Sequence, residues 1–276
     1  LTTDVTSIED RRGKMEELFG GLAEAGVVRS TLQLAWRFTV ASDASIAGPM
    51  LAMRDDAFKR LGSAAPSFTV DQVIETDLPE GIGRRVTGTV EVPLYLEGVG
   101  EPGARLRRNA EGEPEYAGSA FSAYFTCQIP SEAVEPDGDK ARPVVYGHGL
   151  MGGAGEAENS QVAKNASTNN MAYCATDWIG MSGSDIGNVA AILQDISKFP
   201  SLPERSLQGV LNTLFMARAM KHPKGFASNA AFRNAAGEPV IDTKEVYFDG
   251  NSQGHILGGA ATAVSQEWTR AVLGVG

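Results

Sequence analysis

Gly250-Asn251-Ser252-Gln253-Gly254 is the stretch that decides the fold, because it matches the G-x-S-x-G pattern and stands between two recognisable elements. The run from Glu245 to Asp249 before it predicts a strand, and the small residues from Gly258 to Ala261 after it predict a close-packed helix. A serine on such a strand–turn–helix projects its Oγ into a cleft, and glycines two residues to either side, here Gly250 and Gly254, leave room for the crowded turn. We therefore predict that Ser252 is a nucleophile, rather than an idle serine on an ordinary glycine-rich turn.

A second glycine-rich stretch, Tyr146-Gly147-His148-Gly149-Leu150, follows an apolar run earlier in the chain. A turn at this place can present backbone N–H groups to a developing oxyanion. We predict that the N–H groups of Leu150 and Gln253 are the two donors, that Gly149 lets the backbone turn, and that His148 shapes the loop. The alternatives are a plain glycine-rich loop and a phosphate-binding loop, and the second is disfavoured because the stretch lacks G-K-[ST].

The style of the sequence changes near residue 142, after which short apolar runs alternate with helical patterns, as is typical of a parallel sheet covered on both faces. The earlier part favours antiparallel strands with added helices and an exposed loop at 97–118. The patterns predict strands at 31–40, 86–96, 119–129, 144–146, 172–177, 246–248 and 271–273, and helices at 8–25, 45–61, 185–197, 204–220 and 253–265. We divide the chain into N-terminal strands and accessory helices, 1–118, and an α/β core, 119–276, which together form one domain.

The composition narrows the classes of function. The 276 residues carry a formal net charge of −10, and an acidic surface repels nucleic acid. No run approaches the roughly 18 apolar residues that span a bilayer. Three histidines and two cysteines show no metal-ligand spacing, so we expect no metal and no organic cofactor. Cys127 and Cys174 are either two buried thiols in strands or one disulfide of an exported protein, and their spacing does not decide between these.

In this order and on these elements, Gly147–Leu150 and Gly250–Gly254 resemble the motifs of the α/β-hydrolase superfamily, with the resemblance covering residues 119–276. With Ala175–Ser182 between them, they are similar to exported bacterial serine esterases and lipases. The resemblance implies a mixed, mostly parallel sheet with helices on both faces, antiparallel N-terminal strands, and a Ser-His-Asp mechanism that acts on carboxylic esters. It also implies a secreted, periplasmic or cell-envelope protein with a small-molecule or lipid ester as substrate.

The resemblance breaks after the nucleophile. The superfamily places the acid and then the histidine of the triad after the serine, but only Glu267 and His255 follow here, and neither stands where the fold puts these groups. A serine without a base is a weak nucleophile. We therefore expect the chain alone to be nearly inactive, and a C-terminal segment or second chain to supply the histidine and the acid and to cover the sheet edge at 271–273.

Several other residues are candidates for the surroundings of the site. Asp177 ends a strand, and we interpret it as a hydrogen-bonding loop anchor rather than as pocket lining. Trp178, Met181 and Phe199 either line an acyl pocket or pack in the core and lid. Residues 183–203 exceed what the fold requires, and we assign them as a candidate lid.

The sequence thus favours a serine hydrolase that cleaves carboxylic esters through an acyl-enzyme on Ser252. Two other functions stay open: a peptidase or amidase of the same fold, and a non-catalytic binding protein that keeps the hydrolase fold. A panel of ester and amide substrates separates esterase from amidase. The missing histidine and acid favour the binding protein, whereas the intact elbow and oxyanion loop oppose it.

Overall fold

The computed structural model describes residues 3–276, which form two compact units, one up to Ile46 and one from Ala47 to Gly276. The first unit contains α1 (Thr6–Glu9), α2 (Arg12–Glu24) and the 3₁₀ turn η1 (Arg29–Thr31), and none of these elements buries a residue. The helix predicted at 8–25 is therefore two helices, separated by a turn at residues 10 and 11.

The strand predicted at 31–40 is wrong, because residues 32–42 form neither helix nor strand. Its apolar side chains, Leu34, Trp36, Phe38 and Val40, are exposed. Alternation produces a strand only where a second strand takes the backbone hydrogen bonds and a core covers the apolar face. Within residues 3–276 no strand pairs with this segment, so its alternating pattern does not produce a strand.

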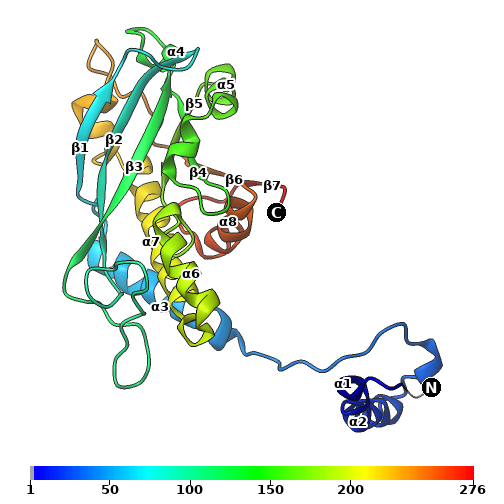
Figure 1. Cartoon of the computed structure of the whole chain (residues 1–276). Helices are drawn as coiled ribbons and strands as arrows, with labels where there is room; N and C mark the ends of the chain where they lie inside the picture. The colour runs from blue at the N-terminus through cyan, green and yellow to red at the C-terminus, as the bar shows by residue number, and fades with distance from the viewer. Residues whose placement is uncertain (1–2) are drawn as a thin grey trace. The chain divides into compact units, whose positions relative to one another are not determined.

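The second unit is built on one seven-stranded sheet in the order β1-β2-β3-β5-β4-β6-β7, counted over the described residues (Figure 1). The pairs from β1 to β5 are antiparallel, and the pairs from β5 through β4 and β6 to β7 are parallel. The strands are β1 (Phe68–Ile74), β2 (Ile82–Pro93), β3 (Ala120–Pro130), β4 (Arg142–Gly147), β5 (Met171–Thr176), β6 (Tyr247–Asn251) and β7 (Ala271–Gly274). The predicted fold class, a mixed α/β sheet with antiparallel N-terminal strands, is confirmed.

Helices lie on both faces of this sheet, as predicted. Alternate residues of β4 show the two layers: Val145 belongs to the core under α7 and α8, whereas Val144 and Tyr146 belong to a smaller core under α5. The helices are α3 (Asp43–Leu61), α4 (Ser131–Val134), α5 (Ser160–Asn169), α6 (Ile186–Gln194), α7 (Ser201–Lys221) and α8 (Gln253–Val264). Between residues 3 and 276 no helix combines the length and apolar character that crossing a bilayer requires.

Three elements were not predicted: β1, α5 and the four-residue helix α4. β1 is an edge strand with no buried residue, so its sequence carries little alternation. α5 reads SQVAKNASTN and buries only the small residues Ala163 and Ala166, which gives a weak apolar stripe. The predicted loop at 97–118 is largely exposed, but it folds back on itself through isolated bridges, one of which joins Leu96 to Leu106.

The two cysteines form a disulfide, which settles the question left open by the sequence. Cys127 on β3 and Cys174 on β5 are register partners and both are buried. The bond therefore ties the antiparallel half of the sheet to the parallel half. Disulfides are typical of oxidising compartments outside the cytosol.

Candidate active site

Ser252 lies on a strained turn between the end of β6 and the start of α8. Its backbone has φ 57° and ψ −116°, a conformation that costs a residue other than glycine about 1–3 kcal/mol. Hydrogen bonds on both sides hold it there: the Ser252 N–H donates to the Gly274 carbonyl (2.9 Å), and the Ser252 carbonyl accepts from the His255 N–H (3.0 Å). Strain that the surroundings maintain in this way is concentrated at functional sites.

The glycines around Ser252 are required by close backbone packing. A Cβ atom on Gly250 would lie 2.2 Å from the carbonyl oxygen of Gly254. A Cβ atom on Gly254 would lie 2.0 Å from the carbonyl oxygen of Gly147, the last residue of β4. The turn that carries Ser252 therefore packs directly against the strand that leads into the second glycine-rich loop.

The peptide between Gly149 and Leu150 is fixed in orientation. The Gly149 carbonyl accepts hydrogen bonds from His148 Nδ1 (2.9 Å) and from the Gly152 N–H (3.2 Å). Because the peptide is trans, the Leu150 N–H lies in the same plane as the Gly149 carbonyl and points in the opposite direction. Among residues 3–276 neither the Leu150 N–H nor the Gln253 N–H has an acceptor, so both predicted oxyanion donors are free to bind a ligand.

His148 fastens the loop to the end of the next strand. Its ring is buried, and Nε2 accepts a hydrogen bond from the Trp178 N–H (2.8 Å) just after β5. Because Nε2 is an acceptor, the imidazole is neutral and its proton sits on Nδ1, which donates to the Gly149 carbonyl. His148 therefore bonds to backbone groups of both loops, and the loop-shaping role predicted for it stays a prediction.

The side chain of Gln253 is a clasp between two loops. Its Oε1 accepts from the Met151 N–H (3.3 Å), and its Nε2 donates to the Met181 carbonyl (2.8 Å). A third bond, from the Gly183 N–H to the Gly152 carbonyl (2.7 Å), joins the same loops beside it. The Gln253 side chain thus joins the loop after β4 to the loop after β5, while its backbone N–H has no acceptor among the described residues.

Two carboxylates accept hydrogen bonds from backbone N–H groups of the loop after β4. Asp177 accepts from the Ala154 N–H (2.7 Å), which is the loop-anchor contact predicted for it. Glu156 accepts from the Gly149 N–H (2.7 Å), a role that the sequence analysis missed. The signal for Glu156 is weak in the sequence, because an acidic residue several positions beyond a glycine-rich turn is common on ordinary surface loops.

The other candidates make no hydrogen bond to the serine hydroxyl among the described residues. Glu267 is buried and pairs with Arg218 of α7, whose Nε donates to it at 2.9 Å. His255 lies one turn into α8 with a buried Nδ1 that has no partner among the described residues. Within residues 3–276 no histidine or carboxylate is hydrogen-bonded to the Ser252 Oγ. Trp178 is buried in the core, whereas Phe199 is about half exposed.

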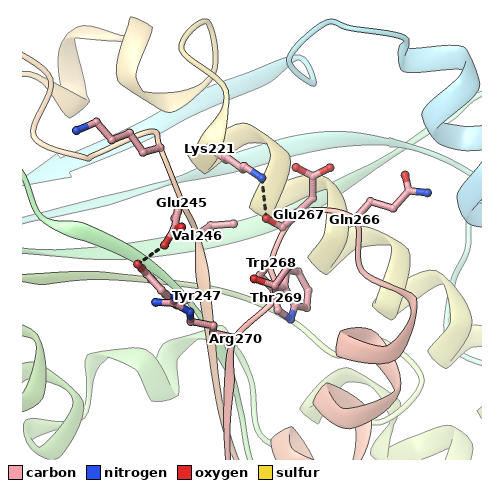
Figure 2. Close-up of a pocket in the computed structure, with 10 residues that line it drawn as sticks. Lys221, Glu245, Val246, Tyr247, Gln266, Glu267, Trp268, Thr269 and Arg270 are labelled. Atoms are coloured by element: carbon pink, nitrogen blue, oxygen red, sulfur yellow. Dashed lines mark hydrogen bonds between the residues drawn. The ribbon is translucent and has the colours of Figure 1, made fainter.

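A small cavity lies at the other end of the parallel strands, away from Ser252. Figure 2 shows residues that line it, among them Tyr247 at the start of β6 and Arg270 just before β7; its volume is roughly 220 Å³. Its polar groups pair with one another: Lys221 Nζ donates to the Glu267 carbonyl (2.9 Å) and the Tyr247 hydroxyl to Glu245 (2.6 Å). No cluster of three or more metal-binding side chains occurs in the part of the chain that the structure describes.

Asp249 on β6 gives a prediction about pH. Burial raises the pKa of its carboxyl, although the Tyr173 hydroxyl donates to it (3.0 Å). The unfolded chain then loses this proton first as pH rises above about 4, so the free energy of unfolding falls towards neutral pH. We expect Asp249→Asn to remove that loss, so that its melting temperature exceeds the wild-type value by more at pH 7 than at pH 4. Thermal melts across this range test it, with the exposed Asp71→Asn as control. An advantage of Asp249→Asn that shrinks with rising pH would contradict the sign.

The comparisons with known proteins concern the fold. No protein-family model matches the chain, and no curated protein matches it. Among solved structures it is similar to acetyl xylan esterase 1 from Thermoanaerobacterium sp. (13% identity, TM-score 0.45, covering 86% of this chain and 59% of that one). It is also similar to an acetyl xylan esterase from Paenibacillus sp. (15%, 0.43, 90% and 64%) and to a glucuronoyl esterase from Teredinibacter turnerae (9%, 0.38, 76% and 46%). The chain thus spans less than two thirds of the length of each of these enzymes, and an assignment of function depends on the geometry of the site.

Proposed function

We propose that this chain is the core of a serine hydrolase that cleaves carboxylic esters through an acyl-enzyme on Ser252. One observation carries the proposal: a serine held at φ 57° between a strand and a helix, next to Gln253, whose backbone N–H, like that of Leu150, has no acceptor among residues 3–276. Backbone strain at residues other than glycine is concentrated at functional sites, and buried N–H groups without a protein partner require a ligand or water. A nucleophile elbow with an oxyanion hole accounts for both features.

The reaction follows from this arrangement. The Ser252 Oγ adds to the ester carbonyl while its proton passes to a general base, and the carbonyl oxygen becomes an oxyanion held by the Leu150 and Gln253 N–H groups. Collapse expels the alcohol, which takes the proton, and water then releases the acid by the same two steps. No described histidine contacts the Oγ, so in this proposal the base and its acid lie outside residues 3–276.

The proposal extends to location and to the arrangement of the chain. We infer an exported protein, because the disulfide between Cys127 and Cys174 suits an oxidising compartment. We also infer that 119–276 is the catalytic core, because every contact of the site described above falls within it, and that 183–203 serves as the lid.

The test is covalent labelling of the folded chain with a fluorophosphonate, followed by intact mass and peptide mapping. We expect a slow adduct on Ser252 that forms several-fold faster when imidazole is added, because imidazole substitutes for the external base. Ser252→Ala should carry no adduct, whereas Ser160→Ala, on exposed α5, should label like the wild type. A folded wild-type chain that stays unlabelled in imidazole would contradict the proposal and favour the binding protein.

Ester and amide hydrolysis are then separated by leaving group. We expect p-nitrophenyl butyrate to be turned over and the matched p-nitroanilide to be turned over far more slowly. The reverse preference would move the assignment to a peptidase or amidase of the same fold.

A further inference from the structure

Large apolar side chains are exposed on the three segments that carry Ser252, the loop after β4 and the start of α6. Leu150, whose N–H is an oxyanion donor, is 69% exposed, and Ile256, one turn into α8, is 65% exposed. Ile186, at the start of α6, is 56% exposed. The α6 side is tied to the oxyanion loop by the bond from the Gly183 N–H to the Gly152 carbonyl (2.7 Å). These three side chains therefore border the place where an ester would bind.

The three segments that carry these side chains hold few charged residues, although Glu156 and Asp177 lie just beyond them and accept hydrogen bonds from the loop after β4. The segments 147–155, 178–187 and 250–264 contain a single charged residue, Asp185, in a chain of which 21% is charged. Asp185 is itself buried and paired with Arg205 of α7. A charged or hydroxyl-rich substrate would find no free charged side chain on these three segments to bind it.

An apolar stripe leads away from this site along α6. Ile186 and Leu193 are two turns apart on one side of the helix, a rise of about 10 Å, and Leu193 is 82% exposed. Two further apolar residues just beyond the helix, Ile196 and Phe199, are exposed and half-exposed. Exposed apolar residues that occur singly are normal, but a group of them on one helix and the turn after it indicates a binding surface.

We propose that the substrate is an ester of a medium- or long-chain fatty acid, whose acyl chain lies on Leu150 and Ile256 and along the α6 stripe. The proposal rests on the proposed function of Ser252. The acyl chain is the occupant because Leu150 serves the site twice: a carbonyl oxygen bound to its N–H brings the attached chain against its side chain. A second copy of the chain would also cover the stripe. Contact between two copies, however, gives no reason for an exposed apolar side chain on the residue that carries the proposed oxyanion donor, Leu150.

The first experiment measures kcat/KM for p-nitrophenyl esters from acetate to decanoate, in the imidazole buffer used for labelling. Each methylene that leaves water fully strengthens binding about fourfold, so we expect octanoate to exceed acetate by about tenfold or more. Leu193→Asn and Ile186→Asn should each lower the octanoate-to-acetate ratio by roughly fivefold. Val73→Asn, which changes an exposed apolar residue on the edge strand β1, is the matched control and should leave the ratio unchanged.

The second experiment needs no catalysis. Methyl NMR of the wild-type chain should show shifts at Leu150, Ile186 and Leu193 with decan-2-one but not with butan-2-one. Labelling of Ser252 without a chain-length preference and without these shifts would overturn the substrate assignment and leave the hydrolase standing. Shifts with decan-2-one in a chain whose Ser252 never labels would instead remove the hydrolase and with it the ester. A concentration-dependent dimer abolished by Leu193→Asn, with an unchanged octanoate-to-acetate ratio, would assign the stripe to self-association.

Discussion

Asp185→Ala should lower the free energy of unfolding of the second unit by about 3–5 kcal/mol, because it leaves a buried guanidinium without its counter-charge. The side chains of Asp185 and Arg205 are 0% and 5% exposed and form an ion pair. Asp185 also accepts hydrogen bonds from the Gly180 N–H (2.9 Å) and the Ser182 hydroxyl (2.7 Å). One substitution therefore leaves a charge and several polar groups unpaired in a water-poor place.

Removing one partner of a buried ion pair lowers the free energy of unfolding far more than replacing both partners with apolar residues. The double variant Asp185→Leu with Arg205→Met removes both charges, so it should recover a large part of the lost stability. Glu115→Ala breaks an exposed pair with Arg107 and should cost about 0–1 kcal/mol, which makes it the matched control. Urea unfolding followed by near-UV circular dichroism measures all three. Equal losses for Asp185→Ala and Glu115→Ala would show that the buried pair is not what holds this loop.

The pair of Asp185 and Arg205 is also a contact that the sequence did not predict. Asp185 and Arg205 are 20 residues apart and read as ordinary charged residues, the first in the candidate lid at 183–203 and the second in the helix predicted at 204–220, yet the structure buries them together as a hydrogen-bonded pair. Arg205 Nε also donates to the Gly100 carbonyl (2.9 Å), in the excursion between β2 and β3. Such partners are set by tertiary packing, which no local pattern encodes.

The strand–turn–helix at Ser252 was readable, because the strand and the helix on either side of it have strong patterns of their own. Gly250 is required within the turn, where its Cβ would meet Gly254, whereas Gly254 is required by packing against Gly147 of β4, a contact that the local pattern does not explain. The segment at 31–40 shows the opposite case. Its alternation is as clean as that of β2, but a strand needs a partner, and the sequence of one strand does not say whether a partner exists. The pattern of one segment thus predicts its local geometry, but not which distant segment will pair with it.

Gln253→Glu should slow the labelling of Ser252 by about tenfold at neutral pH, and the loss should grow with pH. The substitution keeps an oxygen for the Met151 N–H but replaces the Nε2 donor to the Met181 carbonyl with an oxygen. A protonated carboxyl can still donate to that carbonyl, whereas the carboxylate repels it and opens the clasp beside the oxyanion donors. Because the site is buried, the pKa of the new carboxyl should lie above its usual range, which brings the change into a measurable window.

The readout is the rate of fluorophosphonate labelling from pH 5 to pH 8, expressed relative to the wild type at each pH. Gln266→Glu, on the exposed loop before β7, adds the same charge away from the clasp and should leave the ratio flat. A loss that is equal at every pH would mean that Gln253 acts only through packing, and no loss would mean that the clasp does not position the oxyanion donors. A ratio that falls as pH rises would show that the proposed donors at Leu150 and Gln253 depend on the hydrogen bond from the Gln253 side chain to the Met181 carbonyl. The loop after β4 and the loop after β5 would then act together on Ser252.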